Sequence, residues 1–175
     1  MMGTKLFLKF SRFRLALLGA LLLFPMLGMA TTYRLDDSAS PRSRVAPQMT
    51  LSDEGRPLAE SLAPRSATVR YGRIEYRLAT ASFVGRQARI YLVVPTNIPG
   101  LRAPAGLQLV WQGSGRFTSG AARPGERRLV WSGVVPGAWM QESLDLTLEL
   151  NLAYFQLPAN NTVGFESYFE IEVTP

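Results

Sequence analysis

The chain contains neither cysteine nor histidine among its 175 residues, and its only lysines are Lys5 and Lys9. The lack of cysteine excludes a disulfide, thiolate chemistry and a lipid-modified cysteine. Catalysis by a Ser/His or Cys/His pair is excluded as well, and so is a Ser/Lys pair anywhere beyond the first nine residues. Because no disulfide is available, the fold must be stabilised by its apolar core.

The first thirty residues have the pattern of a secretory signal peptide. Basic residues up to Arg14 precede the uncharged run 15–30, which ends in the small residues Gly28 and Ala30. A basic head, a short apolar middle and a small-residue exit are typical of a cleavable leader. The run is sixteen residues long, whereas roughly 20 apolar residues span a bilayer as a helix. We predict cleavage after Ala30 and export to the periplasm, the cell surface or the medium, with an uncleaved anchor as the alternative.

Removal of the leader changes the charge of the chain. The whole sequence carries 19 basic and 13 acidic residues. Four of the basic residues and none of the acids lie in the leader, so 15 basic and 13 acidic residues remain, a net charge of +2. A nucleic-acid-binding domain carries basic residues clustered on one face, and a net charge of +2 gives little indication of such a cluster. We predict no nucleic-acid partner, and a membrane contact only through the leader.

Residues 31–66 differ in composition from the rest of the chain. They contain four prolines, many serines and charges of both signs, and their apolar residues follow neither a period of 2 nor one of 3.6. Such a segment offers too little apolar surface to offset the entropy lost on ordering it. We predict a flexible stalk rich in Pro, Ser and Arg over 31–66, with a short helical turn near Leu58. A binding arm that orders on a partner is the alternative.

From residue 67 onward, apolar residues recur at every second position. The clearest run is 144–152, in which leucines alternate with polar residues. A strand places such leucines on one face, whereas a helix would scatter them around its circumference. Further runs, separated by segments rich in Gly and Pro, occur at 74–78, 88–94, 107–111, 129–131 and 169–173.

Six or seven short strands without a convincing helix predict an all-β domain over 67–175. The pattern favours an antiparallel two-layer β-sandwich, immunoglobulin-like or jelly-roll-like, and a small barrel is the alternative. The Cys…Trp…Cys spacing of true immunoglobulin domains is absent, and so is any internal repeat. The domain is similar to pilin-like and other bacterial surface sandwiches in architecture alone, without a shared motif.

The charges of this domain are segregated along the sequence. Residues 67–128 carry ten arginines against Glu75 and Glu126, whereas residues 129–175 carry six acids and no basic residue. In an antiparallel sheet the early strands can lie beside the late ones, and each cross-strand charge pair contributes about 0.2–1 kcal/mol. The alternative is a bipolar surface for self-association or a protein partner. The candidate residues of that surface are Glu166, Glu170, Glu172, Arg73, Arg77 and Arg89.

Glu170 and Glu172 also satisfy the spacing of paired catalytic carboxylates. On one strand face they would lie about 7 Å apart, within the window of about 5–9.5 Å found in glycosidases. Any Glu-x-Glu on a strand does the same, so a solvated strand face explains the pair. A calcium loop of the form D-x-D-x-D-G is missing, and the glycine-rich segment 113–120 lacks the Gly-Lys-Ser/Thr ending of a phosphate loop. We predict no catalytic residue, no metal and no cofactor.

Aromatic side chains offer a different function, the stacking of sugar rings. Trp111 and Trp131 share the parity of neighbouring leucines, so we expect them in the core. Trp139 follows a Pro-Gly turn in a loop and is the main candidate for a ligand-binding residue, with Tyr154 as the second. The sequence thus predicts an exported, non-catalytic structural or interaction subunit of the bacterial-type cell envelope or of a surface assembly. A carbohydrate-binding module that recognises a glycan is the alternative.

Overall fold

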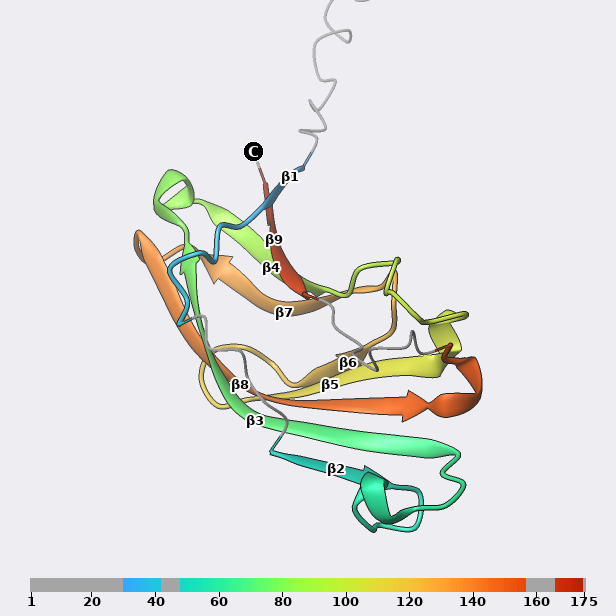
Figure 1. Cartoon of the computed structure of the whole chain (residues 1–175). Coiled ribbons are helices and arrows are strands. Elements are labelled where there is room, and N and C mark those ends of the chain that lie inside the picture. Colours follow the sequence, from blue (N-terminus) through green and yellow to red (C-terminus); the bar gives the residue numbers. More distant parts are fainter. Residues whose placement is uncertain (1–29, 42–47, 157–165, 175) are drawn as a thin grey trace, which may run out of the picture.

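Two antiparallel β-sheets pack face to face in the computed structural model, which describes residues 30–41, 48–156 and 166–174 (Figure 1). The four-stranded sheet has the order β1-β9-β4-β7, and the five-stranded sheet has the order β2-β3-β8-β5-β6. The two sheets do not close into a barrel, so the predicted β-sandwich is confirmed. The strands are β1 (Thr31–Arg34), β2 (Met49–Ser52), β3 (Ser66–Ala79), β4 (Gln87–Val93), β5 (Leu107–Gly113), β6 (Gly120–Ala122), β7 (Arg127–Val134), β8 (Trp139–Asn151) and β9 (Tyr168–Val173).

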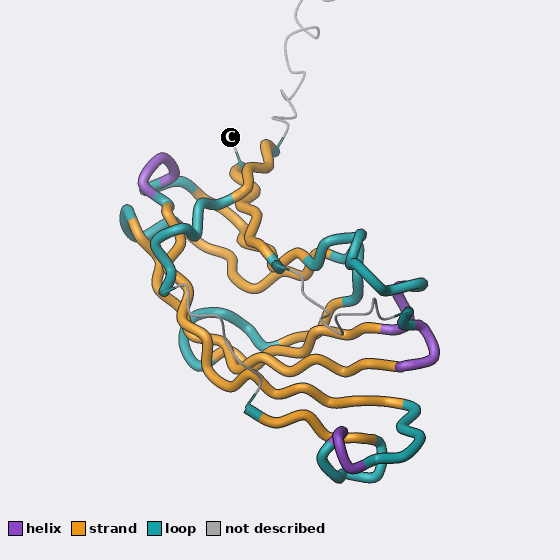
Figure 2. Tube along the Cα trace, viewed as in Figure 1, coloured by secondary structure: helices purple, strands orange, loops and turns teal. Residues whose placement is uncertain are grey.

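The period of two located six of these strands. Each of the predicted runs falls on β3, β4, β5, β7, β8 or β9, and helical structure in the described residues is limited to short 3-10 turns in the connections (Figure 2). The leucine run ends one residue early, because the 3-10 turn Leu152–Tyr154 begins where β8 stops. The strand β6 begins at Gly120, the last residue of the glycine-rich segment 113–120, and was not predicted, because its sequence Gly-Ala-Ala shows no alternation of apolar and polar residues.

The core lies between the sheets and contains most of the apolar residues of the alternating runs. Leu129 of the run 129–131 is 48% exposed instead, and its neighbour Val130 is buried, because the register of β4 against β7 shifts between Ile90 and Tyr91. Trp111 is buried as predicted, and its indole N–H donates to the carbonyl of Thr118 at 2.9 Å, so its polar atom is satisfied. Trp131 is partly buried against the same core. The largest fully buried side chains include Trp111, Phe169, Leu78, Ile90, Leu92, Leu144 and Ile171.

A β-bulge divides β3 into two parts with opposite facing. The register against β8 shifts between Arg70 and Gly72, and one extra residue in a strand exchanges the parity of the positions that face inward. Val69 is buried before the bulge and Leu78 is buried after it. Gly72 has a φ of +73°, a left-handed conformation that glycine adopts without steric cost.

The structure contradicts the predicted flexible stalk over 31–66, because both described parts of this segment contain strands that pair with the sandwich. The strand β1 pairs with β9, from Thr31 opposite Val173 to Arg34 opposite Glu170, and β2 pairs with β3. Leu35 belongs to the buried core, and its backbone N–H donates to the carbonyl of Phe169 at 2.8 Å. The folded unit therefore begins near residue 31 instead of residue 67.

Composition did not reveal these strands, because their hydrogen bonds join backbone groups to strands more than a hundred residues away or to β3, and almost any residue supplies such groups. The short helical turn expected near Leu58 is present as the 3-10 turn Leu58–Glu60. Residues 42–47 of the expected stalk lie outside the described residues.

The start of β1 and the end of β9 lie at the same end of the sandwich (Figure 1). Ala30, the predicted cleavage residue and the last residue of the predicted leader, directly precedes β1 and is exposed. Residues 1–29 of the leader lie outside the described residues. In the part of the chain that the structure covers, no helix has the length and apolar character needed to cross a membrane.

Candidate functional site

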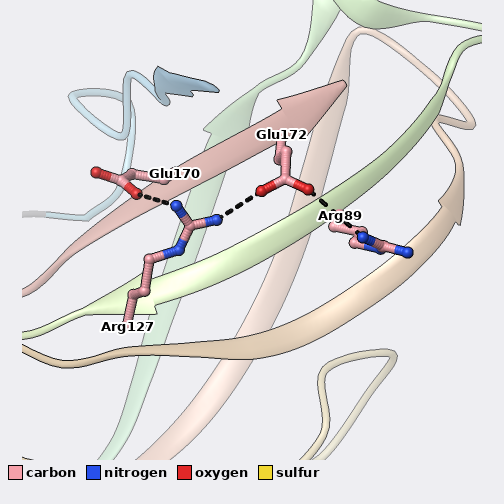
Figure 3. Close-up of polar contacts among 4 residues, drawn as sticks. All are labelled: Arg89, Arg127, Glu170 and Glu172. Carbon is pink, nitrogen blue, oxygen red and sulfur yellow. Dashed lines mark hydrogen bonds and ion pairs between the residues drawn. The ribbon is translucent and has the colours of Figure 1, made fainter. Parts of the chain in front are cut away.

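The outward face of the four-stranded sheet brings together charges from the two halves of the domain. Arg127 on β7 reaches Glu170 at 3.6 Å and Glu172 at 2.8 Å, both on β9, and Arg89 on β4 reaches Glu172 at 3.5 Å (Figure 3). The early arginine-bearing strand β4 therefore lies beside the late acidic strand β9, as one interpretation of the charge pattern expected, and Arg127 of β7 reaches β9 across β4. Glu170 and Glu172 are engaged within the molecule, so they do not form an open acidic patch.

Two tyrosines complete this face. The guanidinium of Arg127 lies 3.8 Å from the ring centre of Tyr91 on β4, so the arginine crosses that ring on its way to β9. At the β1 edge, the guanidinium of Arg34 lies 4.4 Å from the ring centre of Tyr168. We name this surface the Arg–Tyr–Glu face; it consists of Arg34, Arg89, Arg127, Tyr91, Tyr168, Glu170 and Glu172.

Exposed apolar side chains adjoin the Arg–Tyr–Glu face on β7. Leu129 lies opposite the outward-facing Tyr91, and Val134 lies opposite Gln87. Leu129 is 48% exposed and Val134 is 57% exposed. The face thus combines paired charges, aromatic rings and an apolar margin.

The structure does not place the six predicted partner-binding residues on one surface. Arg89, Glu170 and Glu172 share the Arg–Tyr–Glu face, whereas Arg73 and Arg77 lie on β3 in the other sheet. Glu166 precedes β9 and is not part of it. Sequence separation and charge could not reveal this division, because it depends on which sheet each strand joins.

The two predicted ligand-binding aromatics lie far apart. Trp139, at the start of β8, is 45% exposed, and the guanidinium of Arg77 lies 4.7 Å from its ring centre, so one face of the indole is covered. Tyr154 lies in the 3-10 turn beyond the other end of β8. Twelve strand steps of roughly 3.3 Å separate the ends of β8, about 40 Å. The two rings therefore do not stack on one small ligand.

Sequence reasoning missed Glu142, the one buried acid among the described residues. Its exposed fraction is 6%, and its carboxylate accepts hydrogen bonds from the backbone N–H of Arg116 at 2.8 Å and of Phe117 at 3.4 Å. A side chain at Gly115 would collide with this carboxylate, so the glycine leaves the necessary space. Glu142 has the same parity as Leu144 in the alternating pattern. This parity, which predicts that an acid faces the core, was the signal by which sequence reasoning could have identified Glu142.

Tyr76 lies beside Glu142 on the neighbouring strand, directly opposite it in the register. Its ring packs edge-on against Phe169, with the ring centres 5.0 Å apart. Burial raises the pKa of Tyr76 to about 12, a hydrogen bond with Ser167 acts in the other direction, and the carboxylates of Asp37 and Glu166 raise it slightly further. Tyr76 is therefore protonated at neutral pH and offers no base.

An open cavity of about 580 Å³ adjoins Tyr76 and Glu142. Its wall is mostly polar and comes from four segments, namely residues 39–41, residues 75–77 of β3, residues 114–116 in the loop after β5, and residues 141–143 of β8. Among the described residues, no group of three or more carboxylate, histidine or cysteine side chains is placed to hold a metal ion. The cavity is lined by Ala39, Pro41, Glu75, Tyr76, Arg77, Ser114, Gly115, Arg116, Gln141, Glu142 and Ser143.

Comparison with known proteins gives no guide to the site, because no family model, no curated protein and no solved structure matches the chain. The function must therefore be inferred from the geometry of the molecule.

Proposed function

We propose that the protein is an exported, non-catalytic interaction subunit of the cell envelope or of a surface assembly. It binds a protein partner, or a second copy of itself, through the Arg–Tyr–Glu face. The observation that carries this proposal is the position of Arg127, which contacts the ring of Tyr91 and both carboxylates of β9. The pattern of the leader supports the export.

The chemistry of the face is that of a protein interface. Tyrosine and arginine are enriched in such interfaces, and lysine is depleted. Arg127 is already held by Tyr91, Glu170 and Glu172. Its side chain therefore loses less conformational entropy on binding than that of an unconstrained arginine. The adjoining Leu129 supplies apolar area. Because the charges neutralise one another, binding is expected to rely on aromatic and apolar contacts more than on a bipolar field.

Site-specific crosslinking in the producing cell tests this proposal. A photoreactive amino acid at Leu129, beside the face, should give a discrete adduct of higher mass, which mass spectrometry assigns to a partner or to a second copy. The control position is Glu149, which is exposed on β8 in the other sheet and should give no such adduct. Equal adducts at both positions, or none at Leu129, would contradict an interface at this face.

The leader requires its own test. Intact mass of the protein recovered from cells should correspond to a chain that begins at Thr31, since Gly28 and Ala30 supply the small residues of a cleavage site. A product that retains residues 15–27 and stays in the membrane after a carbonate wash would show an anchor instead.

The alternative function is carbohydrate binding through Trp139. Its 45% exposed indole supports this alternative, since an accessible aromatic ring can stack on a sugar. A glycan array distinguishes the two proposals: bound glycans would be lost in Trp139→Ala and kept in Tyr154→Ala, with little dependence on salt. A protein interface at the Arg–Tyr–Glu face predicts no specific glycan for either variant.

A further inference from the structure

One end of the sandwich gathers the elements next to the leader. Thr31, the first residue of β1, pairs with Val173 at the end of β9. The 3-10 turn Ala81–Phe83 belongs to the same end, because the ring of Phe83 packs against that of Tyr33 with centres 5.3 Å apart. Figure 1 shows the start of β1, the end of β9 and the turn before β4 on the same side of the molecule.

The ends of two further strands meet this turn. Val134 at the end of β7 lies opposite Gln87, the first residue of β4 after the turn. Trp139 at the start of β8 lies opposite Ala79, the last residue of β3 before the turn. Four of the eight exposed large apolar side chains of the described residues are therefore found here, and we name them the apolar end patch. They are Tyr33 (45% exposed), Val84 (50%), Val134 (57%) and Trp139 (45%).

We propose that the apolar end patch contacts the surface of a lipid bilayer. The occupant follows from the sequence that precedes Thr31, since the uncharged run 15–30 reaches the first residue of β1 without a spacer. As long as that run is in a membrane, the end of the sandwich that bears Thr31 lies at the lipid–water boundary. This inference concerns the end of the sandwich and does not depend on the Arg–Tyr–Glu face, although Val134 belongs to the patch and also adjoins that face.

The side chains of the patch suit that boundary. Tryptophan and tyrosine are enriched at membrane interfaces, where the ring is buried and its polar atom remains hydrated. The two valines add apolar area at the same level. Charges near the patch have both signs, with Arg34, Arg77 and Arg86 basic and Asp36 and Asp37 acidic. Attraction to anionic lipid is therefore small, and apolar burial drives the contact.

Flotation with lipid vesicles tests the contact on the protein as cells produce it, with its N-terminus established by intact mass. Vesicles of phosphatidylcholine alone, and of equimolar phosphatidylcholine and phosphatidylglycerol, should carry the protein to similar extents at low and high salt. The double variant Val84→Asp, Val134→Asp should reduce the bound fraction by about tenfold or more, because two apolar side chains no longer enter the interface. The matched control is Met49→Asp, Leu62→Asp, which likewise replaces two exposed apolar side chains by aspartate, outside both the patch and the Arg–Tyr–Glu face, and should bind as the unaltered protein does.

Fluorescence gives a second measurement. It remains informative even if the leader is retained and binds the vesicles independently of the patch. Phosphatidylcholine brominated near the headgroup should quench the emission of Trp139, and Trp139→Phe should remove most of the quenching, because Trp111 is buried and Trp131 is partly buried against the core. Circular dichroism identifies any variant that has not folded, and the single change Val134→Asp then replaces the double one. The proposal is overturned if the unaltered protein shows no quenching, or if the patch variant and its control lose binding equally. Loss of crosslinking at Leu129 with quenching intact would refute the protein interface and leave the lipid contact standing.

Discussion

The two halves of β8 share one alternating pattern and yet bury different chemistry. In the half Leu144–Leu150, leucines face the core and the strand has neighbours on both sides, β3 and β5. In the half Trp139–Glu142, β5 has already ended at Gly113, and the loop that follows it takes its place. There the inward positions are occupied by Met140 and by Glu142, whose carboxylate accepts hydrogen bonds from two amides of that loop.

The difference shows that the parity of a residue in the strand determines whether its side chain faces the core. The neighbouring backbone then determines whether an apolar or a polar side chain is stable at that inward position. Beside a complete strand, all amides are paired in the ladder and an apolar side chain fits best. Beside a loop, amides such as those of Arg116 and Phe117 need another acceptor, because a buried N–H without one is costly. An acid at an inward position is then stabilising.

The largest effect on stability is expected from substitutions in the leucine half of β8, Leu144–Leu150. Leu146→Asp or Leu148→Asp should prevent folding, since each side chain is buried and an unpaired carboxylate there costs more than about 4 kcal/mol. Chemical denaturation followed by circular dichroism measures the free energy of unfolding. Glu149→Ala, an exposed position on the same strand, should change it by less than about 0.5 kcal/mol. Equal tolerance at all three positions would contradict the assigned facing.

The second prediction concerns a substitution that gives the inward acid position of the first half of β8 the leucine found in the second half. Glu142→Leu should lower the free energy of unfolding by about 2–4 kcal/mol, because two amides lose a charged acceptor that leucine cannot replace. Glu142→Gln retains a carbonyl oxygen and should lose clearly less. Hydrogen exchange of the amides of Arg116 and Phe117 should accelerate more in the leucine variant. A Glu142→Leu protein as stable as the parent would mean that the inward acid is not a loop anchor.

The third prediction concerns Tyr76, which lies opposite Glu142. Its pKa is raised from 10 to about 12 by burial, so the folded state favours the protonated phenol. Stability from this group is complete below pH 10 and is lost as pH rises toward 12, with about 2–3 kcal/mol at stake. Tyr76→Phe should remove this alkaline decline, as seen in denaturation midpoints at pH 8 and above pH 10. An unchanged alkaline decline would assign it to other groups.

The smallest expected effect is on the outward side of the same half. Arg77→Ala removes the guanidinium above Trp139, and an exposed contact of this kind contributes about 0.5–1 kcal/mol. The backbone N–H of Arg77, which donates to Ser40, is kept in the variant. Indole emission of Trp139 should change while the denaturation midpoint moves little. A loss as large as that of Glu142→Leu would show that the outward side matters as much as the inward one.

Alternation predicted most of the strands that bury one face, and it also predicted Trp111 in the core, because most of these runs continue over five or more residues. In the shortest run, 129–131, it gave the wrong facing, since Leu129 is exposed and Val130 is buried. It did not predict β1, β2 or β6, which are three or four residues long and gain most of their stabilisation from backbone pairing. The candidate site was predicted only in fragments. Glu170, Glu172 and Arg89 meet because β9 and β4 are neighbours, whereas Arg73 and Arg77 joined the other sheet.

By itself the sequence determined the fold class and the facing of most of the long strands, since both depend on residues close together in the chain. Only the tertiary structure decided which strands pair, that residues 31–34 add a strand to β9, and that Arg127 reaches across Tyr91 to two acids more than forty residues away. The physical reason is that strand pairing uses backbone N–H and C=O groups, which are the same in almost every residue and leave no mark in the sequence.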